Sequence, residues 1–80
     1  MHYKVPIILE PQPEGGYTVT SSVLPELVTE GESIDEAMEN AKDALAAVIE
    51  LYEESGRVLP PGLRIDESRH AIMVDTVLAA

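Results

Sequence analysis

The chain has 80 residues, and its fifteen Asp and Glu against five Lys and Arg give a formal net charge of −10. Eighty residues suffice for one domain with a thin core, and the absence of cysteine excludes disulfides and thiolate metal sites as extra stabilisation. So acidic a surface disfavours binding to nucleic-acid phosphates or anionic membranes, and it favours a basic partner.

The first half of the sequence predicts three strands. Residues Tyr3 to Leu9 alternate as a strand does. The residues that fall on its apolar face are Tyr3, Val5, Ile7 and Leu9. Pro6 cannot donate to a ladder, which favours an edge position. Pro11 to Gly16 predicts a hairpin loop, and strands are expected at Tyr17 to Ser21 and, more briefly, at Leu27 to Glu30.

A long helix is predicted from Ser33 to Ser55. Ser33 and Glu36 have the spacing of a capping box, and Gly56 is a natural C-terminal stop. Gly31 is expected to turn the chain into this helix. The apolar residues recur at helical spacing, at Ile34, Ala37, Met38, Ala41, Leu45, Val48 and Tyr52.

After the helix, Val58 to Gly62 predicts an extended connector, and His70 to Leu78 predicts a last strand. The expected fold class is therefore α+β in the order β-β-β-α-β, a mainly antiparallel sheet with one long helix packed on one face. We expect residues 1–80 to form a single domain without a separate C-terminal DNA-binding domain. The sequence has no membrane-length apolar run and no signal-peptide pattern, so a cytoplasmic location is expected.

Residues of the kind that carry catalysis are present but scattered. His2 and His70 lie at opposite ends of the sequence, so no metal site and no cofactor is expected, and Gly15-Gly16 lacks the spacing of a phosphate loop. The chain is therefore not expected to be an enzyme. One alternative stays open, a metal-dependent nuclease built from Glu10, Asp66 and Asp75.

The helix has an acidic surface and an apolar second half. Seven carboxylates and one lysine between residues 35 and 54 give it a net charge of −6, over half of the total. The apolar residues of the second half exceed what one buried face needs, so they predict self-association, as a homodimer or higher oligomer. The residues proposed for this contact are Ala46, Ile49, Leu51 and Tyr52. Alternatively, the connector Val58 to Leu63 folds back and covers them.

Several short runs together resemble the HicB antitoxin family over residues 1–61. They are Glu14-Gly15-Gly16-Tyr17-Thr18-Val19-Thr20, Leu24-Pro25, Val28-Thr29-Glu30-Gly31-Glu32-Ser33, Glu36-Ala37 and Asn40-Ala41. The resemblance implies a truncated, degenerate ribonuclease H-like fold without catalytic apparatus. It also implies a function, that of an antitoxin in a type II toxin-antitoxin pair, which masks a small basic HicA-type toxin that cleaves messenger RNA.

The sequence departs from the family pattern at one loop. The usual P-D-L-P-G-C run stands here as Ser22 to Leu27, with Glu26 in place of glycine. On charge and expected exposure, the candidates for contact with the toxin are Glu14, Glu30, Glu32, Asp35 and Glu39. With five basic residues, DNA binding by this chain alone is not expected. A stand-alone oligomeric domain without a toxin remains the main alternative.

Overall fold

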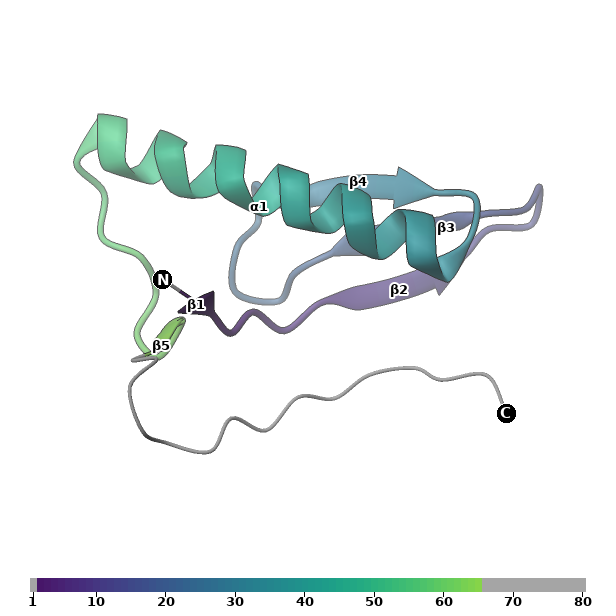
Figure 1. Ribbon diagram of the computed structural model, residues 1–80, viewed down its shortest axis with the longest axis horizontal. Helices are drawn as coiled ribbons and strands as arrows, with labels where there is room; N and C mark the ends of the chain where they lie inside the picture. Colours follow the sequence, from purple (N-terminus) through teal and green to yellow (C-terminus); the bar gives the residue numbers. More distant parts are fainter. Residues whose placement is uncertain (1, 66–80) are drawn as a thin grey trace.

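The computed structural model describes residues 2–65 as one helix lying across a small antiparallel sheet, with a second strand pair at one end (Figure 1). The elements in chain order are β1 (His2–Tyr3), β2 (Ile8–Pro11), β3 (Tyr17–Thr20), β4 (Val28–Gly31), α1 (Ile34–Ser55) and β5 (Arg64–Ile65). This arrangement confirms the predicted α+β class. The predicted strand His70 to Leu78 lies outside the described residues.

The three-stranded sheet has the order β2-β3-β4, and both strand pairs are antiparallel. The β2–β3 loop is a hairpin, as predicted: the Gln12 N–H donates to the Gly16 carbonyl at 3.0 Å. Gly15 and Gly16 adopt φ of 104° and 79°, a backbone conformation that other residues rarely adopt. The register places Leu9, Val19 and Thr29 side by side on the face that packs against α1.

The prediction of one continuous strand over Tyr3 to Leu9 is wrong, but the predicted division into a buried and an exposed face is correct. The structure divides it into β1 and β2, and residues 4–7 belong to neither. Pro6 lacks an N–H, and its carbonyl accepts a hydrogen bond from the Ser21 hydroxyl at 2.8 Å, a side-chain contact and not a ladder bond. The alternation persists nonetheless, because residues 3, 5, 7 and 9 are half-buried while residues 4, 6, 8 and 10 are exposed.

Helix α1 begins and ends with the predicted caps. The Ser33 hydroxyl accepts a hydrogen bond from the Glu36 N–H at 3.1 Å, and the Glu36 carboxylate accepts one from the Glu32 N–H at 3.1 Å. Gly56 has φ of 70°; its N–H donates to the Glu53 carbonyl and the next N–H donates to the Tyr52 carbonyl. This pair of bonds is a Schellman motif, which satisfies carbonyls of the last turn.

Replacing Ser33 tests the N-cap directly. Ser33→Ala removes the acceptor for the Glu36 N–H, so we expect it to lower the free energy of unfolding by about 1 kcal/mol in urea denaturation. Ser22→Ala is the matched control, because Ser22 is exposed and makes no side-chain hydrogen bond within the described part of the chain. An equal, negligible loss in both variants would show that the cap contributes nothing.

The core consists of two clusters arranged along α1. The first joins the sheet to the first half of the helix and consists of Val19, Ala37 and Ala41. The second joins the loop after β3, the second half of the helix and the chain that follows it, and consists of Leu24, Leu27, Val48, Tyr52 and Leu63. Leu59 also packs against the second cluster, so the connector does fold back onto the helix.

The connector leads into β5, a strand that the sequence analysis did not predict. β5 pairs antiparallel with β1, with Tyr3 opposite Arg64, and the Lys4 N–H donates to the Leu63 carbonyl at 2.7 Å. The chain that follows the helix is thereby held against the N-terminal segment. Among the described residues, none forms a helix both long and apolar enough to cross a membrane.

Candidate functional site

The β2–β3 hairpin, the end of β4 and the start of α1 meet around an acidic hollow. The register pairs Tyr17 with Gly31, so the hairpin loop comes to lie beside the turn that leads into the helix. The hollow has a volume of about 650 Å³. The side chains that give it its chemical character are Glu14, Tyr17, Glu30, Glu32, Glu36 and Asn40.

Side-chain hydrogen bonds hold the walls of this hollow in place. The Asn40 amide donates to the Glu30 carbonyl at 2.7 Å, which ties the helix to β4. The Gln12 amide donates to the Thr18 hydroxyl at 3.1 Å across the hairpin. Glu36 is engaged in capping, whereas the carboxylates of Glu14, Glu30 and Glu32 have no hydrogen-bond or ion-pair partner among the described residues.

The structure brings together three of the five residues predicted to contact a partner. Glu14, Glu30 and Glu32 line the hollow, whereas Asp35 and Glu39 are exposed on the adjoining surface of α1 and do not line it. Sequence reasoning assigned Glu36 to capping alone and did not predict that it also lines the hollow. The capping-box spacing was a usable signal, because the N3 carboxylate of a capping box lies at the helix start by construction.

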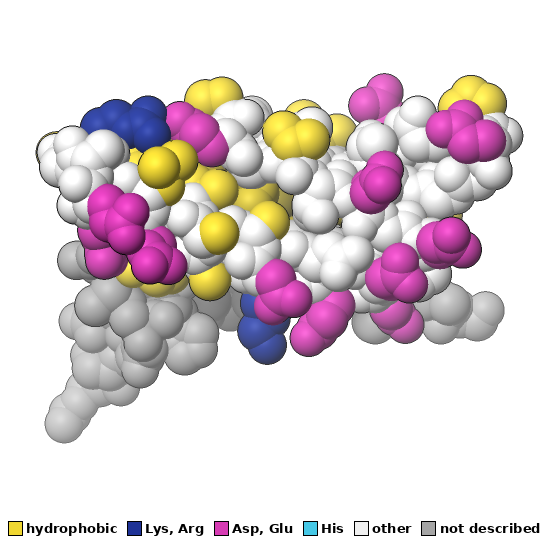
Figure 2. All heavy atoms as spheres, turned by 90° about the horizontal axis from the view of Figure 1, so that it is seen from above, with side chains coloured by type: hydrophobic (Ala, Val, Ile, Leu, Met, Phe, Trp, Pro, Cys, Tyr) yellow, Lys and Arg dark blue, Asp and Glu magenta, His cyan; other side chains and the backbone are white. Residues whose placement is uncertain are grey.

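Acidic and hydrophobic side chains are distributed differently over the molecule. Seen from the helix side, acidic side chains lie over both halves, whereas hydrophobic side chains gather mainly over the half that holds the end of α1 (Figure 2). Several negatively charged carboxylates around a concave surface attract Lys and Arg, and they raise the rate of encounter with a basic protein. The arrangement is suited to binding cationic side chains.

The residues of the nuclease alternative are not brought together by the described structure. Glu10 is exposed on β2, and Asp66 and Asp75 lie outside the described residues, as does His70. Within residues 2–65, no group of three or more His, Asp or Glu is arranged to hold a metal ion.

The four residues predicted for self-association do not form one patch. Ala46 is exposed, Ile49 is half-buried, and Leu51 is 44% exposed. Ala46 and Leu51 are five residues apart, which places them about 140° apart around an α-helix. Tyr52 is only 7% exposed and belongs to the protein's own core.

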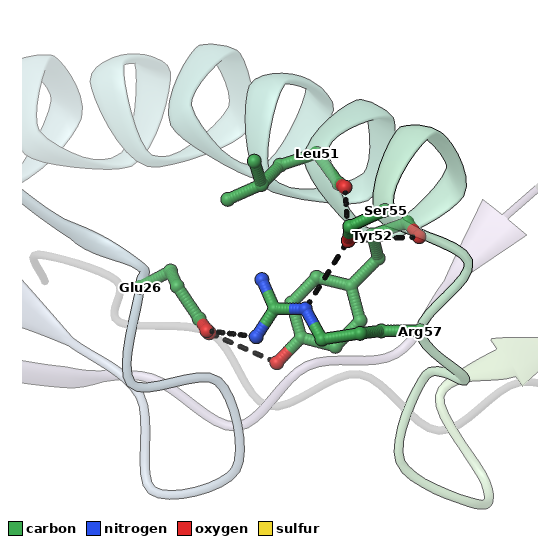
Figure 3. Close-up of polar contacts among 5 residues, drawn as sticks. All are labelled: Glu26, Leu51, Tyr52, Ser55 and Arg57. Atoms are coloured by element: carbon green, nitrogen blue, oxygen red, sulfur yellow. Dashed lines mark hydrogen bonds and ion pairs between the residues drawn. The ribbon is translucent and has the colours of Figure 1, made fainter.

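Glu26, Tyr52 and Arg57 form a polar clamp that sequence reasoning missed (Figure 3). One Glu26 oxygen accepts a hydrogen bond from the Tyr52 hydroxyl at 2.9 Å, and the other forms an ion pair with Arg57 at 2.9 Å. The Arg57 guanidinium also lies 4.3 Å from the centre of the Tyr52 ring. The clamp therefore joins the loop before β4 to the end of α1.

The clamp shifts the pKa of two of its members. The Glu26 backbone amide is the largest cause that lowers the pKa of this carboxyl below its usual 4.5, and the Tyr52 hydroxyl and Arg57 act in the same direction against partial burial. The hydrogen bond to Glu26 raises the pKa of Tyr52 above its usual 10.0.

These directions predict an acid-sensitive contribution to stability. A carboxyl with a lowered folded-state pKa stabilises the fold above its unfolded-state pKa, and that stabilisation is lost as pH falls through the folded-state value. In urea denaturation, Glu26→Gln should lower the unfolding midpoint at pH 7, and the deficit should disappear as the pH falls below 4.5 through the lowered pKa. Glu50→Gln, at an exposed helix position, is the control; a Glu26→Gln deficit that persists in acid would contradict the assignment.

Comparison with known proteins gives one consistent result. A family described as "HicB_like antitoxin of bacterial toxin-antitoxin system" matches residues 3–80. The proteins named Antitoxin HicB from Escherichia coli strain K12 and from Escherichia coli O157:H7 are each 39% identical to the chain over 77 residues, 96% of this chain and 56% of theirs. Antitoxin HicB 1 of Photorhabdus laumondii is 43% identical over 60 residues, 74% of this chain and 39% of its own.

The matched relatives are longer than the chain, which spans about half the length of the two from Escherichia coli. All three are named as antitoxins, and that role is not an enzymatic one.

Proposed function

We propose that this chain, which belongs to the HicB-like antitoxin family, binds and masks a small basic HicA-type toxin that cleaves messenger RNA. The observation that carries this proposal is the acidic hollow at the hairpin and helix start. Glu14, Glu30 and Glu32 present carboxylates there without a partner of their own in the described part of the chain.

Masking follows from the chemistry that an RNA-cleaving protein requires. A surface that binds RNA carries Lys and Arg, which neutralise phosphate charges. Carboxylates on the surface of the chain can form ion pairs with the same Lys and Arg side chains. RNA phosphates are then excluded from these side chains by competition. The chain needs no catalytic group for this action, because binding alone removes the toxin's access to RNA.

Co-purification with the product of the neighbouring gene tests the proposal. We expect the untagged neighbouring product to be retained with the tagged chain, and we expect co-expression of the chain to restore growth to cells that express that product. Retention without rescue would show binding that does not neutralise, and failure of both would contradict the proposed function.

Self-association is a second part of the proposal. Leu51 and Val58 are exposed near the end of α1, 44% and 89% respectively, and hydrophobic side chains gather over this half of the molecule (Figure 2). We propose a homodimer, since closed two-fold assemblies are the commonest. Light scattering on the eluted protein should give the mass of a dimer at micromolar concentration, and a monomer mass would contradict it.

Two further features belong to the same proposal. The toxin's substrate is messenger RNA, so the chain is expected to act in the cytoplasm.

A stand-alone oligomeric domain is the alternative function, supported by the same exposed apolar residues at the end of α1. A small basic reading frame beside the gene would favour the antitoxin, and its absence would favour the stand-alone domain.

A further inference from the structure

The face of the sheet opposite α1 carries an apolar row. Antiparallel pairing places Ile8 opposite Thr20 and Thr20 opposite Val28, so these three side chains lie side by side across β2, β3 and β4. Their neighbours Leu9 and Val19 lie on the other face and pack against or within the core cluster under the helix. Successive residues of a strand point to opposite faces, so the Ile8–Thr20–Val28 row faces away from α1.

This row is unusually apolar for a sheet face that no element of the described part of the chain covers. Ile8 is 51% exposed and Val28 is 65% exposed. An antiparallel sheet with one covered face normally presents polar side chains on the other. Two β-branched apolar side chains on either side of a threonine leave apolar surface in water, which a partner could cover.

A charged row lies beside the apolar row on the same face. Two positions along each strand, the register aligns Glu10, Thr18 and Glu30. The two carboxylates lie on the outer strands of the row, and neither has an ion-pair partner among the side chains of residues 3–63. Because Glu30 also lines the acidic hollow, the apolar row, the acidic row and the hollow form one continuous surface.

The charges select among the possible occupants of this face. Two copies of the chain stacked face to face about a two-fold axis would place the acidic row either against its own copy or against the apolar row. The first arrangement brings like charges together, and the second buries carboxylates against apolar side chains. A protein that presents Lys or Arg beside an apolar patch meets neither obstacle.

We propose that this open sheet face, defined as Ile8, Thr20 and Val28 with Glu10 and Glu30, is the surface on which the basic toxin docks. The inference rests on the proposed function and adds the location of the contact to it. The apolar row supplies the area that is buried in the complex, and the carboxylates pair with the toxin's cationic side chains. Beyond its first turns, which line the hollow, α1 then serves as the support behind the interface.

The double variant Ile8→Thr/Val28→Thr tests the assignment. Threonine retains β-branching, so the strands are preserved while the apolar surface is removed. We expect the affinity for the neighbouring gene product, measured by titration calorimetry, to fall by about tenfold or more. Met38→Gln is the matched control, because Met38 is 45% exposed on α1, on the other side of the sheet, and does not line the hollow, and its affinity should stay within about twofold of the unsubstituted chain.

A second measurement makes the result independent of the variants' folding. In the unsubstituted chain, methyl resonances of Ile8, Thr20 and Val28 should shift when the neighbouring gene product is added, and that of Met38 on α1 should not. Wild-type affinity in the double variant, or unshifted methyl resonances on this face in a chain that binds, would overturn the docking face and leave the antitoxin function standing. Absence of binding by the unsubstituted chain would overturn both.

Discussion

Gly31→Ala is expected to destabilise the protein by about 3 kcal/mol or more, which is a large share of the stability of so small a domain. A Cβ at Gly31 would lie 2.3 Å from the Ala37 backbone nitrogen and 2.6 Å from the Ala37 Cα. These atoms belong to the helix backbone, so no side-chain rotation relieves the clash. The start of α1 would have to move away from β4.

Gly15→Ala provides the contrast that identifies the cause. Gly15 has φ of 104° and nothing within 4 Å of its added Cβ, whereas Gly31 is not among the glycines with positive φ. The alanine at position 15 meets conformational strain only, at about 1–2 kcal/mol. Urea denaturation of both variants should give a clearly larger loss for Gly31→Ala, and equal losses would contradict the close packing of β4 on α1.

Reversing the charges of the hollow should nearly abolish binding to the toxin. The triple variant Glu14→Lys/Glu30→Lys/Glu32→Lys places three ammonium groups where the proposal places the toxin's own cations, and like charges at a contact cost several kcal/mol. We expect the dissociation constant for the neighbouring gene product to rise by about 100-fold or more. Titration at low and high salt should show that the unsubstituted complex weakens as salt rises.

A matched triple reversal separates local contact from net charge. Asp43→Lys/Glu50→Lys/Glu54→Lys changes the net charge by the same amount at exposed positions on α1 that do not line the hollow. It should weaken binding far less. Equal losses in the two triple variants would show that only the overall charge matters, and the hollow would then lose its assignment.

The parts of the fold that could be predicted are those that local chemistry determines. Period-two alternation in residues 3–9 gave the buried face correctly, and the Ser33–Glu36 spacing gave the helix start. The break between β1 and β2 was not predicted. The Ser21 hydroxyl donates to the Pro6 carbonyl at this break, and such a contact between residues fifteen apart cannot be read from the local pattern. β5 was not predicted either, since a two-residue strand has too little pattern to be recognised.

Gly31 and Glu26 both stood out in the sequence, but the structure gives them roles other than those that the sequence indicated. Gly31 was expected to turn the chain, and the structure instead requires it for the close approach of Ala37. Glu26 was noted as a departure from the family's glycine, and the structure gives it Tyr52 and Arg57 as partners from 26 and 31 residues away. Contacts over such separations leave no periodic signal in a single sequence.

The acidic character of the candidate site could be predicted from the sequence, but the set of residues that line it could be predicted only in part. Charge and expected exposure identified Glu14, Glu30 and Glu32, which the hairpin register brings to one hollow. Asp35 and Glu39 were selected by the same reasoning and lie outside it. The apolar row on the open sheet face required the cross-strand register, because Ile8 and Val28 are twenty residues apart in the sequence.

Inhibition of RNA cleavage tests the central claim most directly. The product of the neighbouring gene, purified and incubated with messenger RNA, should cleave it, and the cleavage should fall in proportion to the added chain and cease near a stoichiometric ratio. The triple variant of the hollow should leave cleavage largely intact at the same concentrations. Cleavage that continues unchanged in a large excess of the unsubstituted chain would contradict the account.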